Sequence, residues 1–375
     1  MPDAGAPAFD GVIVVETGAD HVVGGLRLLE RAAFTFARAG ARRLLLVGSS
    51  PTPLARLPDL PITRSEAFDA AVESWLAYAT PHVIVAPAST ITDPPTLAAL
   101  AAASGPPLLV AAGTAALWRC DPTTLGTRLG AGDPLRVAPT AGTAWHPPPG
   151  ALLAAATDDT NRAEAERALY ARLGRSGDGW FTRHVDRRFS RALTRILLPT
   201  GVAPNVITLA SITIGIAGGW CFAAGTPAMA MIGALLFLAS TIIDGCDGEI
   251  ARLTFRESRF GARLDILGDN LVHLFLFGGI AVGLYRRSAE PTVALLGGAL
   301  VLGVCVAMAA VYMCIVRHEP NHRQRMLFEA FASREFAYLL VVLTVTGHLD
   351  WFLWMSAVGT YVFAIGLFVL GRRPA

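Results

Sequence analysis

The chain has 375 residues, of which 53% are hydrophobic and only 16% are charged. Soluble proteins carry about 25% charged residues, so we expect part of this chain to lie in lipid. The net charge is +2 and no segment forms a dense basic block, so nucleic acid is not an expected partner. All 31 basic residues are arginine, which excludes mechanisms that need a P-loop lysine or a Schiff-base lysine.

The cysteines and the N-terminal sequence both indicate a reducing, cytoplasmic start for the chain. The five cysteines are odd in number and have no C-x-x-C spacing, so neither a disulfide framework nor a zinc site is expected. The first residues lack the basic region and apolar stretch that a cleavable secretory signal requires. We therefore expect reduced thiols and a cytoplasmic N-terminus.

Residues 1–175 alternate between short apolar runs and helical patterns. This alternation is typical of a soluble α/β domain with a largely parallel sheet. The stretch 130–150 is rich in Pro, Gly and Thr and is expected to be irregular. The expected strands are 12–15, 44–47, 83–86 and 108–111, and the expected helices are 22–39, 65–78, 96–103 and 161–173.

Residues 176–200 are expected to join this domain to a membrane. Residues 176–179 have the composition of a linker, and 180–198 place apolar residues at helical spacing with arginines between them. A basic amphipathic helix of this kind lies in the membrane interface. A solvated surface helix is the weaker alternative, because the apolar segments begin directly after Pro204.

Residues 201–375 contain six apolar segments and are expected to be an all-α membrane domain. About 20 apolar residues cross ~30 Å of hydrocarbon, and each segment reaches or approaches that length, the fifth least closely. Arginine marks the flanks that belong to one side of the membrane, apart from the pair Arg286 and Arg287. Because arginine is enriched on the cytoplasmic side, we expect six crossings with both termini in the cytoplasm. The segments are 206–223, 228–243, 264–285, 293–315, 336–345 and 351–370.

Four aspartates lie at the edges of the second and third apolar segments: Asp244, Asp247, Asp265 and Asp269. Carboxylates near lipid are costly and repel one another, so such a cluster needs cations. The i,i+3 and i,i+4 spacings put each pair on one helix face, and two neighbouring helices would bring the faces together. An oxygen-only site suits Mg²⁺ or Mn²⁺ rather than zinc, and two ions would fit.

The same segment matches the motif D-x2-D-G-x2-A-R-x8-G-x3-D-x3-D at every fixed position, and the chain thereby resembles the CDP-alcohol phosphotransferase family. The resemblance covers roughly the last half of the chain. It implies two divalent ions that hold the diphosphate of a CDP-linked donor, while Asp269 deprotonates the acceptor hydroxyl and CMP leaves. We count Asp269 both as the base and among the metal ligands. The matched positions are Asp244, Asp247, Gly248, Ala251, Arg252, Gly261, Asp265 and Asp269.

Further residues are assigned to the substrates. Glycines would let a diphosphate approach the backbone closely. Arg252 is expected to contact the diphosphate or to brace the motif, with an i,i+3 ion pair to Glu249 as the alternative. Arg317 and Arg323 are candidates for an acceptor phosphate, although arginines in such loops also follow from topology alone. His273 shares a helix face with Asp269 and is left out of the site. The expected donor-binding residues are Asn205, Thr208, Gly245, Gly248, Ala251, Arg252 and Gly261.

The order of strands and helices before residue 175 is similar to that of a sugar-nucleotidyltransferase fold. Such enzymes use a glycine-rich loop with an Arg and a Lys after the first strand, and an acidic metal ligand after a later strand. Here the loop is Thr17-Gly18-Ala19-Asp20, Ala86-Pro87-Ala88-Ser89 stands where the acid would be, and lysine is absent. We therefore expect a degenerate, inactive domain with a structural or regulatory role.

The resemblance implies transfer of a phosphoalcohol group from CDP-diacylglycerol or CDP-inositol to an acceptor alcohol in phospholipid biosynthesis. Inositol phosphate is the expected acceptor, since a similar fusion makes CDP-inositol with its soluble domain and transfers it to inositol phosphate. Glycerol phosphate and other alcohols are alternatives. A cation-coupled transporter with a regulatory soluble domain is the alternative class. We expect a homodimeric, multi-pass protein of the inner membrane, with membrane lipids around it and the active site facing the cytoplasm.

Overall fold

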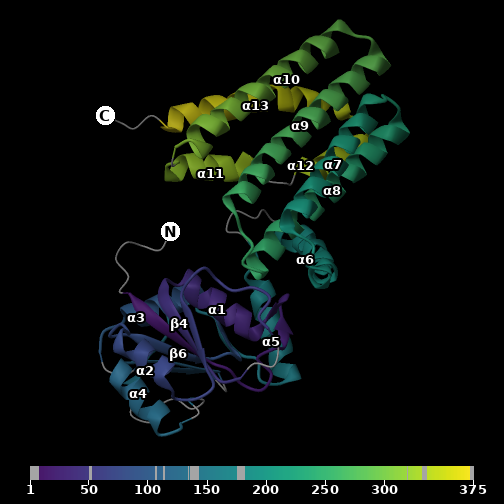
Figure 1. Ribbon diagram of the computed structural model, residues 1–375. Coiled ribbons are helices and arrows are strands. Elements are labelled where there is room, and N and C mark those ends of the chain that lie inside the picture. Colours follow the sequence, from purple (N-terminus) through teal and green to yellow (C-terminus); the bar gives the residue numbers. More distant parts are fainter. Residues whose placement is uncertain are drawn as a thin grey trace. The chain divides into compact units, whose positions relative to one another are not determined.

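A computed structural model describes residues 8–49, 53–105, 108–112, 115–133, 135, 143–174, 182–318, 320–331 and 336–371. The chain divides into two compact units (Figure 1). The first contains Met1–Arg172 together with Leu253–Phe255, and the second contains Leu173–Arg252 and Arg256–Ala375. The predicted linker 176–179 and the arginines Arg334, Arg372 and Arg373 lie outside the described residues.

The first unit is built on a seven-stranded sheet with the order β10-β8-β9-β6-β1-β4-β5. Strands β6, β1, β4 and β5 are parallel neighbours, whereas β9 runs antiparallel to both β6 and β8. The predicted α/β class and largely parallel sheet are confirmed. The strands are β1 (Phe9–Val14), β4 (Ala41–Val47), β5 (Ile62–Ser65), β6 (Val83–Pro87), β8 (Leu108–Ala112), β9 (Ala115–Cys120) and β10 (Thr143–Ala144).

Helices cover both faces of this sheet because successive residues of each buried strand point to opposite sides. In β1, Ile13 packs into a core with Leu29 and Phe36 of α1, while Val12 packs into a second core with Trp75 of α2. Parallel strands buried on both faces give the continuous apolar runs seen in the sequence. The helices are α1 (Leu28–Arg38), α2 (Ala70–Ala77), α3 (Pro94–Ala102), α4 (Pro122–Gly130) and α5 (Asp159–Ala171).

Two of the predicted helices begin later than expected. Residues 22–27 form a hairpin of β2 (Val22–Val23) and β3 (Leu26–Arg27), because Gly24 and Gly25 take the positive φ angles of 56° and 80° that a tight turn needs. Residues 62–65 form β5, and α2 starts only at Ala70, where the Asp69 carboxylate accepts the backbone N–H groups of the first turn. Helical periodicity alone did not reveal either turn.

The second unit is helical. Within the described residues, five helices are long and apolar enough to cross a membrane: Pro204–Ala223, Pro227–Leu253, Arg259–Ser288, Pro291–Ile315 and Leu349–Gly371. The fifth predicted span corresponds to α12, which is apolar but has only 11 described residues. The elements are η1 (Thr182–Asp186), α6 (Arg187–Leu197), η2 (Leu198–Thr200), α7 (Pro204–Ala223), α8 (Pro227–Leu253), α9 (Arg259–Ser288), α10 (Pro291–Val311), η3 (Tyr312–Val316), α11 (His322–Phe331), α12 (Phe336–Thr346) and α13 (Leu349–Gly371).

Helices α7 and α9 lie side by side with their backbones in contact (Figure 1). A Cβ atom on Gly279 would overlap the carbonyl group of Gly219, and one on Gly283 would overlap the carbonyl oxygen of Phe222. Small residues permit this close approach between helices in lipid, where packing rather than hydrophobic burial drives association. The contact fixes the position of α9, and therefore of Asp265 and Asp269, against α7.

We predict that Gly279→Ala destabilises the protein and that Gly278→Ala does not. The added methyl group at 279 meets backbone, which cannot give way as a side chain can, so a loss of about 1–3 kcal/mol is expected. At Gly278 nothing lies within 4 Å of the new methyl group. Thermal unfolding in detergent measures both variants. Equal midpoints for the two would contradict the close contact between α7 and α9.

Candidate metal and nucleotide site

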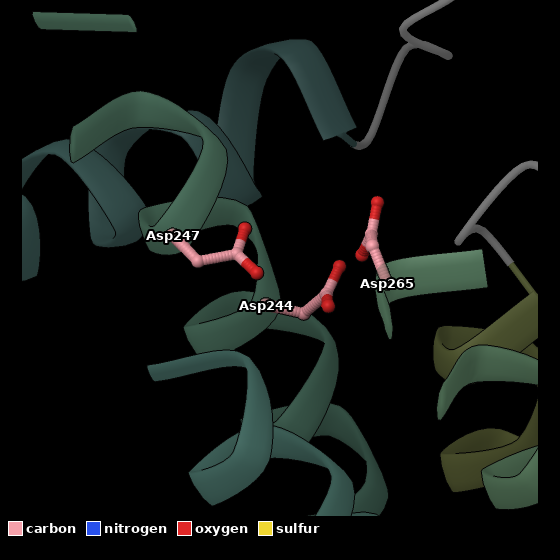
Figure 2. Close-up of side chains that lie close together, drawn as sticks. All are labelled: Asp244, Asp247 and Asp265. Atoms are coloured by element: carbon pink, nitrogen blue, oxygen red, sulfur yellow. The ribbon is translucent and has the colours of Figure 1, made fainter. Parts of the chain in front are cut away.

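Three of the four predicted metal ligands come together in the second unit. Asp244 and Asp247 lie one turn apart near the end of α8, and Asp265 lies in the second turn of α9. One ligand oxygen from each of the three lies within 4.8 Å of the others. Figure 2 shows the carboxylates turned toward a common space, with Asp244 between Asp247 and Asp265. The predicted convergence of the two helix faces therefore holds for these three side chains.

The chemistry of this group fits a hard divalent cation. Asp244 and Asp247 are buried, and Asp265 is partly buried. Negative charges held this close in a low dielectric repel one another strongly unless a cation lies among them. Carboxylate oxygens are the ligands that Mg²⁺ and Mn²⁺ prefer. In the part of the chain that the structure describes, this is the one group of three or more acidic, His or Cys residues with that spacing.

A hydroxyl group on α7 holds Asp247 in place. Thr208 is buried, and its Oγ1 donates a hydrogen bond to Oδ2 of Asp247. Ser211 Oγ donates to the carbonyl oxygen of Thr208 over 2.7 Å, and Ser240 Oγ of α8 donates to the carbonyl oxygen of Ser211 over 2.8 Å. Partners of this kind orient a ligand before a metal binds. Thr208 thus has a positioning function that its place in the sequence did not reveal.

A cavity of about 200 Å³ opens beside Asp247 and Asp265. Its walls contain six of the seven residues predicted to bind the donor, all except Gly245. A Cβ atom on Gly261 would lie 2.9 Å from Oδ1 of Asn205, so a side chain there would narrow the cavity. The lining residues are Pro204, Asn205, Thr208, Asp247, Gly248, Ala251, Arg252, Arg256, Glu257, Ser258, Gly261, Ala262 and Asp265.

Two arginines bring positive charge to this cavity. Arg252 Nη2 donates to the carbonyl oxygen of Leu173 over 3.2 Å, and Arg256 Nη1 donates to that of Gly201 over 3.2 Å. Arg256 was not among the predicted site residues because it falls in the variable part of the motif. Arg256 could have been recognised from the sequence as a cation in the short connection between the two aspartate pairs. Both guanidinium groups suit an anionic ligand such as a diphosphate.

Asp269 lies one turn further along α9 than Asp265 and is not a member of the three-carboxylate group. It lines a second cavity of about 390 Å³, whose other walls are mostly apolar side chains of α9, α10, α12 and α13. His273 also lines this cavity, and its ring stacks on Phe277 with ring centroids 5.7 Å apart. Asp269 is exposed, and among the described residues it is the one carboxylate in the lining of this cavity.

The predicted acceptor residues lie outside both cavities. Arg317 and Arg323 are exposed, the first just after η3 and the second in α11. Neither belongs to the walls of the cavity at Asp265 or of the cavity at Asp269. Their assignment to an acceptor phosphate remains a prediction.

The first unit has a different arrangement at the edge of its sheet. The loops after the parallel neighbours β1 and β6 meet there, and Ser89 Oγ donates a hydrogen bond to Oε2 of Glu16. Each of the two loops thus contributes one member of a hydroxyl–carboxylate pair at the position where open α/β sheets bind nucleotides.

Elsewhere in this unit Cys120 is buried, and burial raises the pKa of its thiol to about 12, which keeps it protonated.

Comparison with protein-family models matches most of the second unit. Residues 201–370 match the family model described as CDP-alcohol phosphatidyltransferase. The chain is 35% identical over 133 residues to the bifunctional IPC transferase and DIPP synthase of Archaeoglobus fulgidus, which is 35% of this chain and 26% of that relative. It is 34% identical over 120 residues to the archaetidylinositol phosphate synthase of Methanothermobacter thermautotrophicus, 32% of this chain and 58% of that relative.

A solved structure is similar to about half of the chain. The phosphatidylinositol phosphate synthase of Mycobacterium tuberculosis with CDP-DAG bound superposes with a TM-score of 0.37 and 18% identity, covering 50% of this chain and 99% of that one. The matched segment spans about a quarter of the length of the Archaeoglobus relative.

We predict that Mn²⁺ stabilises the protein and that Asp244→Asn removes most of this effect. A ligand at 100 times its Kd raises the free energy of unfolding by about 2.7 kcal/mol, and the variant loses one of three converging carboxylates. The measurement is the thermal midpoint with and without Mn²⁺. Asp350→Asn, at an exposed position of α13, is the control and should respond to Mn²⁺ as the wild type does. Equal stabilisation of the wild type and Asp244→Asn would contradict the site.

Proposed function

We propose that the protein transfers a phosphoalcohol group from a CDP-linked donor to an acceptor hydroxyl and releases CMP, because residues 201–370 match the CDP-alcohol phosphatidyltransferase family model. One observation carries the proposal. Three carboxylates converge within 4.8 Å, and two of them, Asp247 and Asp265, border a cavity lined by six of the residues expected to bind the donor. Such a cavity combines a place for cations with a place for a nucleotide diphosphate.

The residues of the cavity take separate roles in this proposal. Asp244, Asp247 and Asp265 would hold divalent ions. The bound ions would neutralise the negative charge of the donor's diphosphate. Thr208 keeps Asp247 oriented, and the absence of a side chain at Gly261 leaves room beside Asn205. Arg252 and Arg256 line the cavity and contribute positive charge toward the diphosphate. Phosphoryl transfer needs little more than this positioning and charge.

Asp269 is the proposed general base. It accepts the proton of the acceptor hydroxyl, the acceptor oxygen forms a bond to the β-phosphorus, and the bond from that phosphorus to the CMP oxygen breaks. Its position one turn beyond Asp265 places it next to the proposed metal centre and at the wall of the second cavity. The acceptor hydroxyl would therefore meet Asp269 beside the metal centre while the nucleotide occupies the first cavity.

The apolar cavity supports the proposed donor, and the names of the relatives support the proposed acceptor. The second cavity is walled mainly by apolar side chains, which favours a substrate with hydrocarbon chains, such as CDP-diacylglycerol, over CDP-inositol. The names of the relatives point to inositol-containing products, so inositol phosphate is the proposed acceptor. Glycerol phosphate or another alcohol is the alternative acceptor for the same chemistry.

We place the protein in the inner membrane as a multi-pass homodimer with the site on the cytoplasmic side. Four arginines at the junction of α8 and α9 support this orientation, because positive charge is enriched on the cytoplasmic face. The proposal counts α12 as a sixth crossing and α6 as a helix in the interface. The arginines are Arg252, Arg256, Arg259 and Arg263.

We predict that Asp269→Asn abolishes turnover and leaves donor binding intact. The amide cannot accept the proton, and loss of a general base costs about 10²–10⁴-fold in rate. CMP release from CDP-diacylglycerol with a panel of acceptors measures turnover, mass spectrometry identifies the product, and titration with CDP-diacylglycerol measures binding. Asp350→Asn is the control. Full activity of Asp269→Asn would refute the assigned base, and wild-type protein that moves a cation in liposomes but releases no CMP would favour a transporter.

The first unit is proposed to be a degenerate nucleotidyltransferase-like domain. We predict that the full-length Asp265→Asn variant, in which the membrane site cannot consume CDP-inositol, produces none from CTP and inositol 1-phosphate. The physical reason is that lysine is absent and that the loop after β6 offers Ser89 in place of an acidic metal ligand. Chromatography of the nucleotides measures the amount of CDP-inositol formed. Accumulation of CDP-inositol would show that this domain is active.

A further inference from the structure

Glu249 lies inside the motif at a position that the motif leaves variable, and it is fully buried. An isolated carboxylate in such a place would be destabilising, because its charge loses the solvation of water. A buried charge is tolerated only where donors surround it. The partners of Glu249 therefore reveal what the end of α8 is built against.

Three hydrogen-bond donors to Glu249 come from one face of α6. Arg187 Nη1 and Ser190 Oγ donate to its Oε1 over 3.0 and 2.8 Å, and Thr194 Oγ1 donates to its Oε2 over 2.8 Å. The three donors follow one another at i, i+3 and i+7, so they share a helix face, and all three are buried. We call these four residues the Glu249 clasp.

The hydrogen bonds of the Glu249 clasp contact α8 on the side opposite the metal ligands. At about 100° per residue, Glu249 points about 200° around the helix from Asp247 and about 140° from Asp244. Cys246 adds a second contact on that side, since its Sγ lies 3.4 Å from the carbonyl oxygen of Ser190. Below the polar contacts, Ile250 and Cys246 pack in an apolar cluster with Leu193. Helix α6 thus fixes both the rotation and the position of the last turns of α8.

We propose that the Glu249 clasp is a positioning device for the metal centre: α6 sets the rotation of α8 so that Asp244 and Asp247 face Asp265. Glu249 touches none of the reacting groups, and it acts through the helix that carries two ligands. The inference rests on the proposed metal site. Partners that orient metal ligands typically change metal affinity or activity by about 10–100-fold when they are removed.

The proposal also changes the function assigned to α6. The sequence suggested a helix that contacts the membrane surface with alternating apolar and basic residues. One of those arginines, Arg187, is buried against Glu249, whereas Arg188 next to it is exposed. The clasp therefore separates a structural arginine from a surface arginine within one turn, and this pair supplies a matched control.

The test measures Mn²⁺ binding to the full-length protein in detergent, in the absence of any donor. The electron paramagnetic resonance signal of free Mn²⁺ reports how much of the ion remains unbound. We predict that Glu249→Gln keeps the shape of the side chain, loses the charge that pairs with Arg187, and weakens Mn²⁺ binding by about tenfold or more. Arg187→Gln should weaken it similarly, and the double variant should add little, because both changes break the same interaction. Arg188→Ala should leave the affinity unchanged.

A milder variant covers the case in which Glu249→Gln fails to fold. Thr194→Val replaces one hydroxyl donor with a methyl group of similar volume, and we predict a smaller loss of Mn²⁺ affinity at an unchanged elution volume in size-exclusion chromatography. Wild-type Mn²⁺ affinity in a folded Glu249→Gln or Thr194→Val protein would overturn the proposal. Normal Mn²⁺ binding by the wild type without CMP release would refute the proposed function and leave the clasp in place.

Discussion

Electrostatic repulsion among three carboxylates is the constraint on which the second unit depends. Asp244, Asp247 and Asp265 bring their oxygens within 4.8 Å of one another in a largely buried place. Two helices must be held together against that repulsion whenever no cation is present. The structure provides three restraints around the group: backbone contact between α7 and α9, the hydroxyl of Thr208 on Asp247, and the contacts of α6 with α8.

These restraints explain why the chain uses small and polar residues at places where an ordinary apolar helix would not. Gly219 and Gly279 let two backbones touch, which no larger residue would allow. Ser211 and Ser240 continue the hydrogen bonds of Thr208 from α7 to α8. Each of these contacts limits the movement of a ligand oxygen relative to the helix bundle. A site held in this way would bind cations without a large rearrangement, which is the condition for effective electrostatic catalysis.

Much of this site could be predicted from the sequence, because the motif fixes residue types whose helical spacing is known. The pairing of Asp244 with Asp247 on one face needs only the geometry of a helix. The partners of Glu249 could not be predicted, since they depend on how α6 packs against α8. The sequence offered an ion pair between Glu249 and Arg252, whereas Glu249 pairs with Arg187 from 62 residues earlier.

The fold was predictable to a similar degree. The apolar runs of β1, β4 and β6 are visible because strands buried on both faces need no alternation. The hairpin at Gly24 was missed because its apolar residues continue the helical period of α1. Asp269 shows the same limit at the site: its spacing from Asp265 is helical, yet it lines a mostly apolar cavity and is not one of the three carboxylates that converge within 4.8 Å.

The central claim is that the converging carboxylates bind divalent ions beside a nucleotide site. The most direct measurement is anomalous X-ray diffraction at the manganese edge from crystals grown with Mn²⁺ and a CDP-linked donor. We predict strong peaks among Asp244, Asp247 and Asp265, with the diphosphate next to them in the cavity bordered by Gly261. Manganese bound elsewhere, with these three carboxylates free of metal and the donor still in place, would contradict it.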